Sequence, residues 1–236
     1  MAISYNTSII RNGLVLYLDA ANPKSYPGTG TSWFDLSGNR FHMSLKNGTS
    51  FNSTLKSFDL DGVDDFGSCD GTIANSVSAT VANLGIGGNS PKTVIAIAQI
   101  REIGSNISGM FEVGDSGVSG QHYCLRLGSS FTAFRAQFWG TPDYDFSYDG
   151  RSNFSVYTVL YPADKIGRTY VNGVLRGQDA SAFDLVLAGN RPFEMGRYVG
   201  GNYGGFRIQG FLVYNRALSE QEIKKIQESF RGRYDI

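Results

Sequence analysis

Residues 58–66 read FDLDGVDDF, a short stretch in which apolar and polar side chains alternate before an acidic turn. Side chains alternate along an extended strand, so Phe58 and Leu60 should point to the same side. The Asp61-Gly62 pair favours a turn, because Asp hydrogen-bonds to nearby backbone and Gly adopts positive φ without steric cost. The stretch therefore predicts a half-buried strand that ends in a tight turn.

Similar strand signals lie on both sides of this stretch. Apolar, aromatic and β-branched runs predict strands, which we place at residues 14–19, 93–100, 131–139, 154–161 and 206–214. The Asn-Gly pairs at 47–48 and 172–173 predict hairpin turns. With 30 Gly, 29 Phe plus Tyr and only 18% charged residues, the composition fits short strands joined by tight turns. The sequence predicts an all-β fold.

One helix is predicted, over residues 219–231. Ser219 and Glu222 have the spacing of a capping box, in which each side chain bonds to the other residue's backbone N–H. The apolar stripe of this helix consists of Ile223, Ile226 and Phe230. Such a stripe needs an apolar partner, so we expect the helix to lie against the sheets. Residues 1–10 are predicted to form either an edge strand or an arm that reaches a neighbouring subunit, and residues 11–236 a single domain.

The charge balance excludes some classes of function. Lys plus Arg and Asp plus Glu each number 21, so no excess positive charge supports binding to nucleic acid or to an anionic membrane surface. Residues 1–10 lack the basic and apolar regions of a signal peptide, and no apolar run is long enough for membrane insertion. Cys69 and Cys124 are expected to be free thiols in a reducing compartment.

Six segments together carry a family resemblance. They are residues 13–20 (GLVLYLDA), 22–28 (NPKSYPG), 33–39 (WFDLSGN), 58–66, 170–174 (YVNGV) and 214–220 (YNRALSE). In this order they resemble LamG-like domains, of laminin G type 3, in the concanavalin A-like lectin/glucanase superfamily. The resemblance runs from about residue 11 to the end. It implies a jelly-roll sandwich of two antiparallel sheets, with six or seven strands each. Residues 18–28 resemble most closely such domains in tailed-bacteriophage virion proteins.

Enzymatic activity is not expected. Glucanases of this superfamily use carboxylates that are closely spaced on one strand, because retaining hydrolysis needs two carboxyl groups about 5 Å apart. Here Glu102, Glu112 and Glu194 have no acidic residue two positions away, and the other three glutamates fall in the predicted helix. The sequence offers no catalytic residues.

Two acidic turns are candidate metal sites. The candidate Ca²⁺ ligands are Asp61, Asp64 and Asp65 in the first turn and Asp143, Asp145 and Asp149 in the second. Ca²⁺ takes six to eight oxygen ligands, which such loops can supply. The resemblance supports Ca²⁺, because many LamG-like domains bind it at a sheet rim. Asp is also a common turn-forming residue, so both interpretations stay open.

Aromatic side chains beside the second acidic turn are the candidate glycan-binding residues. They are Trp139, Tyr144, Phe146 and Tyr148. In a strand, the last three would share one face and could stack on a sugar. The same face could instead pack inward or against another subunit.

These observations lead to a functional hypothesis. The protein is expected to be a non-enzymatic structural protein of a phage virion, of capsid-decoration or fibre type, made in the host cytoplasm. Its partners would be capsid or tail subunits, and its exposed loops would adhere to carbohydrate of the host surface. The alternative is a lectin-like carbohydrate-binding module assisted by Ca²⁺.

Overall fold

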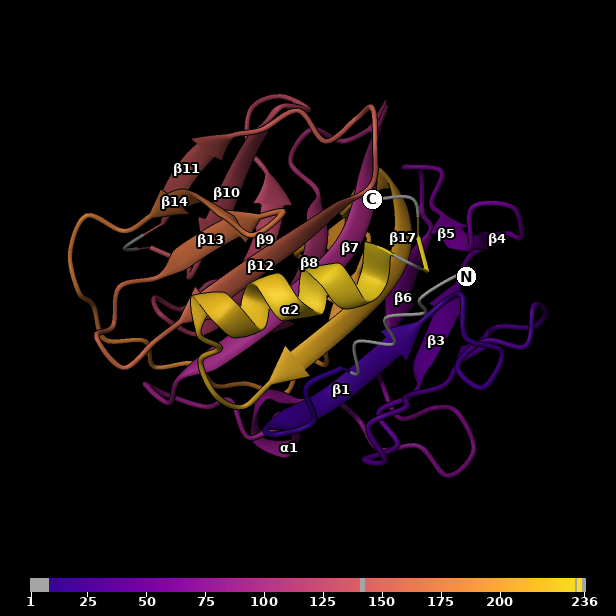
Figure 1. The fold of residues 1–236 in the computed structure, drawn as a ribbon, viewed down its shortest axis with the longest axis horizontal. Helices are drawn as coiled ribbons and strands as arrows, with labels where there is room; N and C mark the ends of the chain where they lie inside the picture. The colour runs from indigo at the N-terminus through magenta and orange to yellow at the C-terminus, as the bar shows by residue number, and fades with distance from the viewer. Residues whose placement is uncertain (1–8, 141–142, 232, 235–236) are drawn as a thin grey trace, which may run out of the picture.

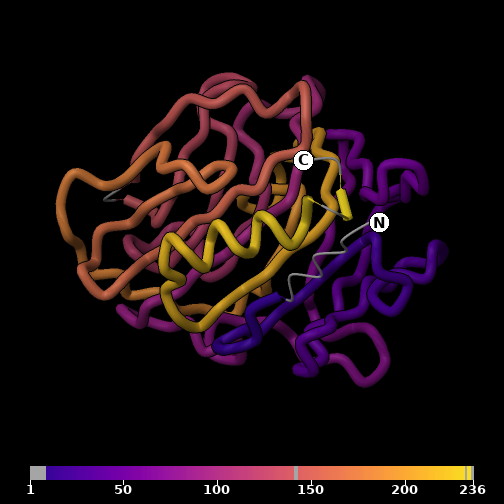
Figure 2. Tube along the Cα trace, in the orientation of Figure 1, coloured from indigo at the N-terminus to yellow at the C-terminus, as the bar shows by residue number. Residues whose placement is uncertain are grey.

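The computed structural model describes residues 9–140, 143–231 and 233–234. Two antiparallel sheets stack face to face, and the helix α2 (Glu220–Arg231) crosses the outer face of one of them (Figure 1). Figure 2 shows the same arrangement as a tube, with α2 lying over the long central strands. The predicted all-β sandwich with a C-terminal helix is confirmed.

The sheet beneath α2 has nine strands. Its main path is β14 (Val174–Gln178), β13 (Arg168–Val171), β12 (Ser155–Tyr161), β7 (Lys92–Gly104), β17 (Asn202–Tyr214), β5 (Ser57–Asp59) and β4 (Ser50–Asn52). Two further strands, β1 (Leu14–Asp19) and β16 (Arg197–Tyr198), also pair with β17. The predicted strands at 14–19, 93–100, 154–161 and 206–214 all fall in this sheet.

The second sheet has eight strands. Their order is β11 (Tyr144–Ser147), β10 (Ala133–Gln137), β9 (His122–Leu127), β8 (Gly109–Gly114), β15 (Glu194–Met195), β6 (Phe66–Ser68), β3 (Met43–Lys46) and β2 (Ser32–Trp33). Both sheets thus have more strands than the six or seven that the resemblance implies, because several short strands extend their edges.

Aromatic side chains fill the space between the sheets. Phe58 and Leu60 are fully buried there, as the alternation in residues 58–66 predicts. The Trp33 ring lies 4.6 Å from the Phe58 ring, centre to centre, and so joins the two sheets. Burial of such large apolar surfaces is the main favourable term for folding.

A second apolar layer lies between α2 and the nine-stranded sheet. Ile223, Ile226 and Phe230 pack on residues of β1, β7, β12 and β17. The capping box is present: the Ser219 N–H donates to Glu222 Oε2 at 2.9 Å, and the Glu222 N–H donates to Ser219 Oγ at 3.2 Å. The predicted docking of the helix is therefore confirmed.

The two predicted hairpin turns differ in outcome. Asn172-Gly173 joins the paired strands β13 and β14, and both residues have positive φ. Asn47-Gly48 also has positive φ, but β3 and β4 belong to different sheets, so this turn links the two sheets and the hairpin prediction is wrong. The sequence also missed a four-residue helix, α1 (Val81–Leu84), capped by Thr80.

The predicted N-terminal arm over residues 1–10 lies mostly outside the described residues. Ile9 is buried in the layer beneath α2, and Ile10 packs against it. Among the described residues, no helix is both long enough and apolar enough to span a membrane.

Candidate functional site

The aromatic face predicted to bind glycan turns inward. Tyr144 and Phe146 of β11 lie in the main core, where Phe146 stacks on Phe134 with ring centres 5.3 Å apart. The Tyr144 and Thr169 hydroxyls form a hydrogen bond of 2.8 Å. Tyr148 packs at the edge of the same core. Neither Tyr144 nor Phe146 offers an open ring face to a sugar, so the inward-packing alternative describes these two residues.

Trp139 points to the other side of the eight-stranded sheet. It follows β10, and its half-buried ring stacks on Tyr198 with centres 6.3 Å apart and planes 27° apart. Its φ of 62° is left-handed, which is uncommon for a residue with a bulky side chain. The four predicted aromatic residues thus do not form one site.

The acids of the second turn do not meet at a metal site either. Asp143 Oδ1 accepts the Phe138 N–H at 2.8 Å. Asp145 forms a two-bond ion pair with Arg135, at 2.6 and 2.8 Å. Asp149 binds the guanidinium group of Arg151. Each carboxylate has its own protein partner, so the predicted Ca²⁺ loop over 143–149 is not formed.

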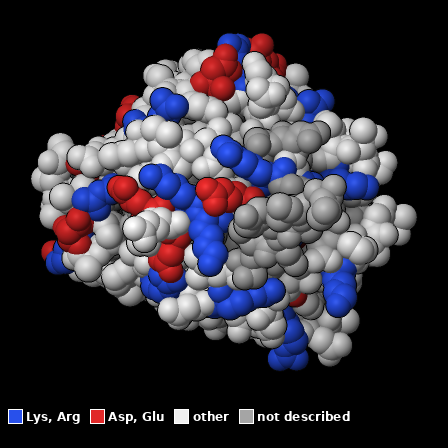
Figure 3. Space-filling view, in the orientation of Figure 1, with Lys and Arg blue, Asp and Glu red and all other residues white. Residues whose placement is uncertain are grey.

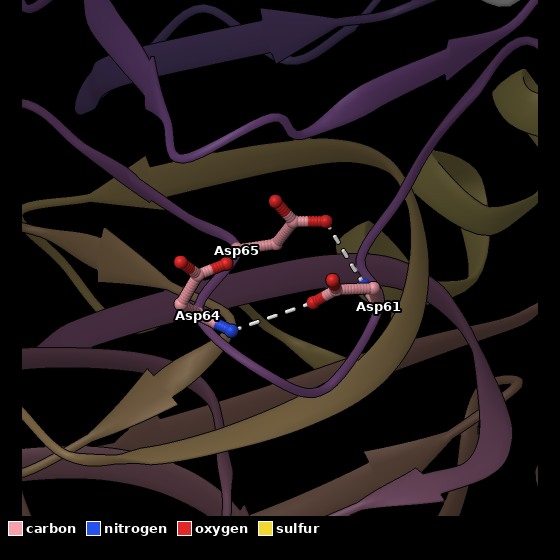
Figure 4. A group of neighbouring side chains, drawn as sticks. All are labelled: Asp61, Asp64 and Asp65. Carbon is pink, nitrogen blue, oxygen red and sulfur yellow. Dashed lines mark hydrogen bonds between the residues drawn. The ribbon is translucent and has the colours of Figure 1, made fainter.

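The first acidic turn does bring its three carboxylates together (Figure 4). One oxygen each from Asp61, Asp64 and Asp65 lies within 4.8 Å of the others, and this is the one acidic group of that kind found in the described part of the chain. Asp61 Oδ1 accepts the Val63 N–H at 2.8 Å, and Asp65 Oδ2 accepts the Asp61 N–H at 3.0 Å. The carboxylates thus also hold the turn itself.

One buried carboxyl oxygen of this turn has no hydrogen-bond partner among the described residues. The hydrogen bond from Val63 lowers the pKa of Asp61, whereas burial raises the pKa of Asp65, with a further contribution from Asp61 and Asp64. Asp65 is 4% exposed, and its buried Oδ1 has no hydrogen-bond partner among the described residues. The three carboxylates, one of which has a buried oxygen without a partner, fit a hard cation such as Ca²⁺, which would take its other ligands from carbonyls and water.

A row of polar residues crosses the outer face of the eight-stranded sheet. Strand register places these residues side by side, and in order they are Ser32, Ser44, Ser68, Glu194, Glu112, Cys124 and Gln137. Glu112 and Glu194 are direct cross-strand neighbours. Residues alternate in facing along each strand, which is why the opposite face of the same strands can remain apolar.

Both glutamates in this row are buried and paired. Glu112 is fully buried, with Oε2 at 3.2 Å from His122 Nε2 and Oε1 at 3.1 Å from an Arg191 guanidinium nitrogen. Glu194 makes two hydrogen bonds with Arg197, at 2.7 and 2.9 Å. Burial opposes ionisation of Glu112, but its bonds to His122, the Val199 N–H and Arg191 hold its pKa below the usual value. Both carboxylates therefore serve as acceptors inside the fold.

The segment that covers Glu112 is held in a strained conformation. Val199 has a φ of 52°, which is rare for a β-branched residue. Its N–H donates to Glu112 Oε2 at 3.0 Å. Such strain costs about 1–3 kcal/mol and persists only where the surroundings enforce it. The buried carboxylate is thus part of what fixes this covering segment.

An open pocket of about 360 Å³ lies beside the covered row, over β9, β10 and β11. Its charged lining residues are Arg126, Arg135 and Asp145, which are cross-strand neighbours on the outer face. Its other lining residues are Ile107, Gly128, Ser129, Ala133, Phe146 and Ser147. Two guanidinium groups against one carboxylate make this lining positive, and the volume is in the usual range for small-molecule sites.

Sequence reasoning missed both the row and the pocket. Glu112 and Glu194 are 82 positions apart, so a search for acids two positions apart on one strand does not find them. Only strand pairing brings them together. The alternation in residues 131–139 did place Arg135 on the side opposite Phe134, which was the available signal for an outward polar face.

Comparisons with known proteins agree with this architecture. Residues 70–224, well over half of the chain, match the Laminin_G_3 family, described as Concanavalin A-like lectin/glucanases superfamily. The chain therefore belongs to this family. A search of curated proteins finds no match.

Solved structures with the same fold include part of a Trypanosoma rangeli sialidase bound to the inhibitor DANA. That match has 17% identity and a TM-score of 0.65, and it covers 93% of this chain but 33% of the sialidase. The binding domain of botulinum neurotoxin DC in complex with SialylT matches with 16% identity and a TM-score of 0.63, covering 93% of this chain and 52% of that domain. This chain therefore spans between a third and about half of these structures, and the likeness establishes the fold.

Proposed function

We propose that this protein is a non-enzymatic binding module displayed on a bacteriophage particle, as a structural component of capsid-decoration or fibre type. The observation that carries the non-enzymatic part is the pairing of Glu112 with His122 and Arg191, and of Glu194 with Arg197. In most glycosidase families, one carboxyl group protonates the leaving oxygen and a second attacks the sugar or activates water. Carboxylates that are buried and already bonded to cations supply neither function.

The particle location rests on the sequence resemblance of residues 18–28. In the structure, Asp19 in this segment is fully buried and accepts a hydrogen bond of 2.6 Å from the Tyr234 hydroxyl. The segment thus fastens Tyr234 to the sandwich. The partners would be capsid or tail subunits, and the chain would be made in the host cytoplasm.

The test is mass spectrometry of purified particles. The proposal predicts this chain in intact particles at a fixed ratio to the major capsid protein, after washing in high salt. Absence from intact particles, together with abundance in the lysate, would contradict the particle location. If the free protein then bound carbohydrate, the lectin-like alternative would replace it.

Calcium binding at the first acidic turn is a second proposal, favoured by the unpaired Oδ1 of Asp65. A cation that binds only the folded state raises its stability. We expect millimolar CaCl₂ to raise Tm relative to EDTA. Asp64→Asn should abolish this rise, because it removes a carboxylate of the cluster. The matched control is Asp149→Asn, which changes an exposed acid outside the cluster and should retain the rise. Equal Tm values in CaCl₂ and EDTA would contradict the proposal.

A further inference from the structure

The pocket over β9, β10 and β11 combines positive charge with unused hydrogen-bond donors. Arg126 is 8% exposed, and its Nε and one terminal nitrogen bond to Gln137 and to the Leu127 carbonyl. Arg135 uses Nε and one terminal nitrogen on Asp145. Within the described residues, the second terminal nitrogen of each guanidinium group has no protein acceptor. Guanidinium N–H groups that are free toward the pocket favour an anionic ligand.

The two arginines lie side by side on the sheet. Arg126 and Arg135 are directly opposite on adjacent antiparallel strands. Their Cβ atoms are therefore about 5 Å apart, so both side chains can reach one ligand. Arg is well suited to carboxylate because its planar fork matches the two oxygens. Asp145 neutralises one of the two cations, so one positive charge remains to attract a ligand.

The rest of the lining suits the other parts of a sugar. The Ser129 and Ser147 hydroxyls line the pocket and form no hydrogen bond among the described residues, so they are free to bond to sugar hydroxyls. Ile107, which is exposed, adds an apolar surface for the C–H face of a ring. Polar groups that fix orientation on an otherwise apolar lining are typical of small-molecule sites.

From these features we infer that the pocket binds the carboxylate-bearing sugars of acidic polysaccharides, with Arg126 and Arg135 as the residues that select for the acid group. This inference rests on the proposed binding function and specifies its ligand class. The sugar carboxylate would lie between the two guanidinium groups, and the ring would lie against Ile107 with its hydroxyls toward the two serines.

The experiment is a titration of the full chain, followed by NMR or calorimetry, with D-galacturonate and with D-galactose. These sugars differ only in the acid group, so they isolate its contribution. We expect galacturonate to bind roughly tenfold more tightly, the scale of a charge-assisted hydrogen bond, and salt to weaken its binding. Acetate should bind much more weakly than galacturonate, because it lacks the hydroxyls and the ring.

Two variants assign the effect to the pocket. Arg135→Gln should reduce galacturonate affinity roughly tenfold while leaving the fold intact, because this side chain is more than a third exposed. Arg151→Gln is the matched control: it removes an equally exposed Arg that is ion-paired with Asp149 outside the pocket, and it should leave affinity unchanged.

Each other outcome overturns the inference. Equal affinity for galacturonate and galactose would identify a neutral-sugar site, and acetate binding as tightly as galacturonate would identify a simple anion site. If the folded protein did not bind galacturonate, or if both variants lost affinity equally, the pocket would not be the binding site. In any of these cases, a protein that still binds a neutral polysaccharide would keep the proposed binding function while losing the acidic-sugar pocket. Failure of the pocket can thus be told apart from failure of the binding function.

Discussion

The outer faces of the two sheets differ in chemistry and in cover. The outer face of the nine-stranded sheet is apolar and lies beneath α2, where Ile223, Ile226 and Phe230 pack against it. Figure 3 shows the surface of that side, where acidic and basic side chains are interspersed. The outer face of the eight-stranded sheet carries Glu112, His122 and Arg126, and it is covered in its centre but open over β9 to β11. One face is thus packed through apolar side chains, whereas the other holds paired polar side chains and an open pocket.

The largest expected effect lies in the apolar layer beneath α2. Phe230→Ala should reduce the free energy of unfolding by about 3–5 kcal/mol, because it removes a side chain that is 1% exposed and leaves a cavity. Urea unfolding measures this change. Lys224→Ala, on the exposed side of the same helix, is the control and should change stability by less than about 0.5 kcal/mol. A small effect of Phe230→Ala would mean that α2 does not stabilise the sheet it covers.

On the polar face, breaking the buried ion pair of Glu112 with Arg191 should reduce the free energy of unfolding by a somewhat smaller amount, and the reduction should depend on pH. Glu112→Gln keeps the shape but removes the charge that faces Arg191, so we expect a loss of about 2–3 kcal/mol at pH 7. The pKa of Glu112 is lowered in the fold, so its contribution is present above the unfolded-state pKa of about 4.5 and is lost as pH falls further.

The loss caused by Glu112→Gln should therefore shrink between pH 5 and pH 3, as seen by denaturant unfolding across that range. The charged or titratable groups around this carboxylate are His122, Arg191 and Glu194. Arg191→Gln, which breaks the same ion pair from the cationic side, is therefore the reference variant. A loss that is equal at both pH values would show that the charge of Glu112 does not matter.

A buried acid that has no such partner should give an effect of the opposite sign. Asp179 is 2% exposed, neither of its carboxyl oxygens has a hydrogen-bond partner among the described residues, and burial raises its pKa to about 7. Its folded-state pKa exceeds the unfolded value, so stability should fall as pH rises from about 4 to 7. Asp179→Asn should raise stability by roughly 3–4 kcal/mol at pH 8, because a shift of about three pKa units corresponds to about 4 kcal/mol, and change little at pH 4.

Thermal unfolding of Asp179→Asn at the two pH values tests this sign. The comparison with Glu112 is direct, because one buried carboxyl group has cationic partners and the other has none. Stabilisation that is equal at pH 4 and pH 8 would mean that the effect of Asp179→Asn does not come from the carboxylate charge.

The sequence predicted the apolar parts of the molecule better than the polar ones. Local alternation located Phe58 and Leu60 in the core, and the spacing of Ser219 and Glu222 located the start of α2. These features depend on residues close together in the chain. The pairing of Glu112 with Glu194 depends on strand order, which short-range patterns do not contain.

The candidate sites show the same limit. The first acidic turn was predicted correctly as a cluster, because all three acids lie within five residues. The aromatic site failed because alternation predicts that Tyr144 and Phe146 share a face but not whether that face is inward. Arg126 and Arg135 were missed because only the pairing of β9 with β10 places them side by side.

The central claim is that the polar face of the eight-stranded sheet binds carbohydrate without cleaving it. The most direct measurement incubates the purified protein with polygalacturonate and follows, in one sample, both the fraction of protein bound and the release of reducing ends. The account predicts binding that Arg135→Gln weakens and no release of reducing ends above the protein-free control. Release of reducing ends that Glu112→Gln abolishes in a folded protein would contradict it.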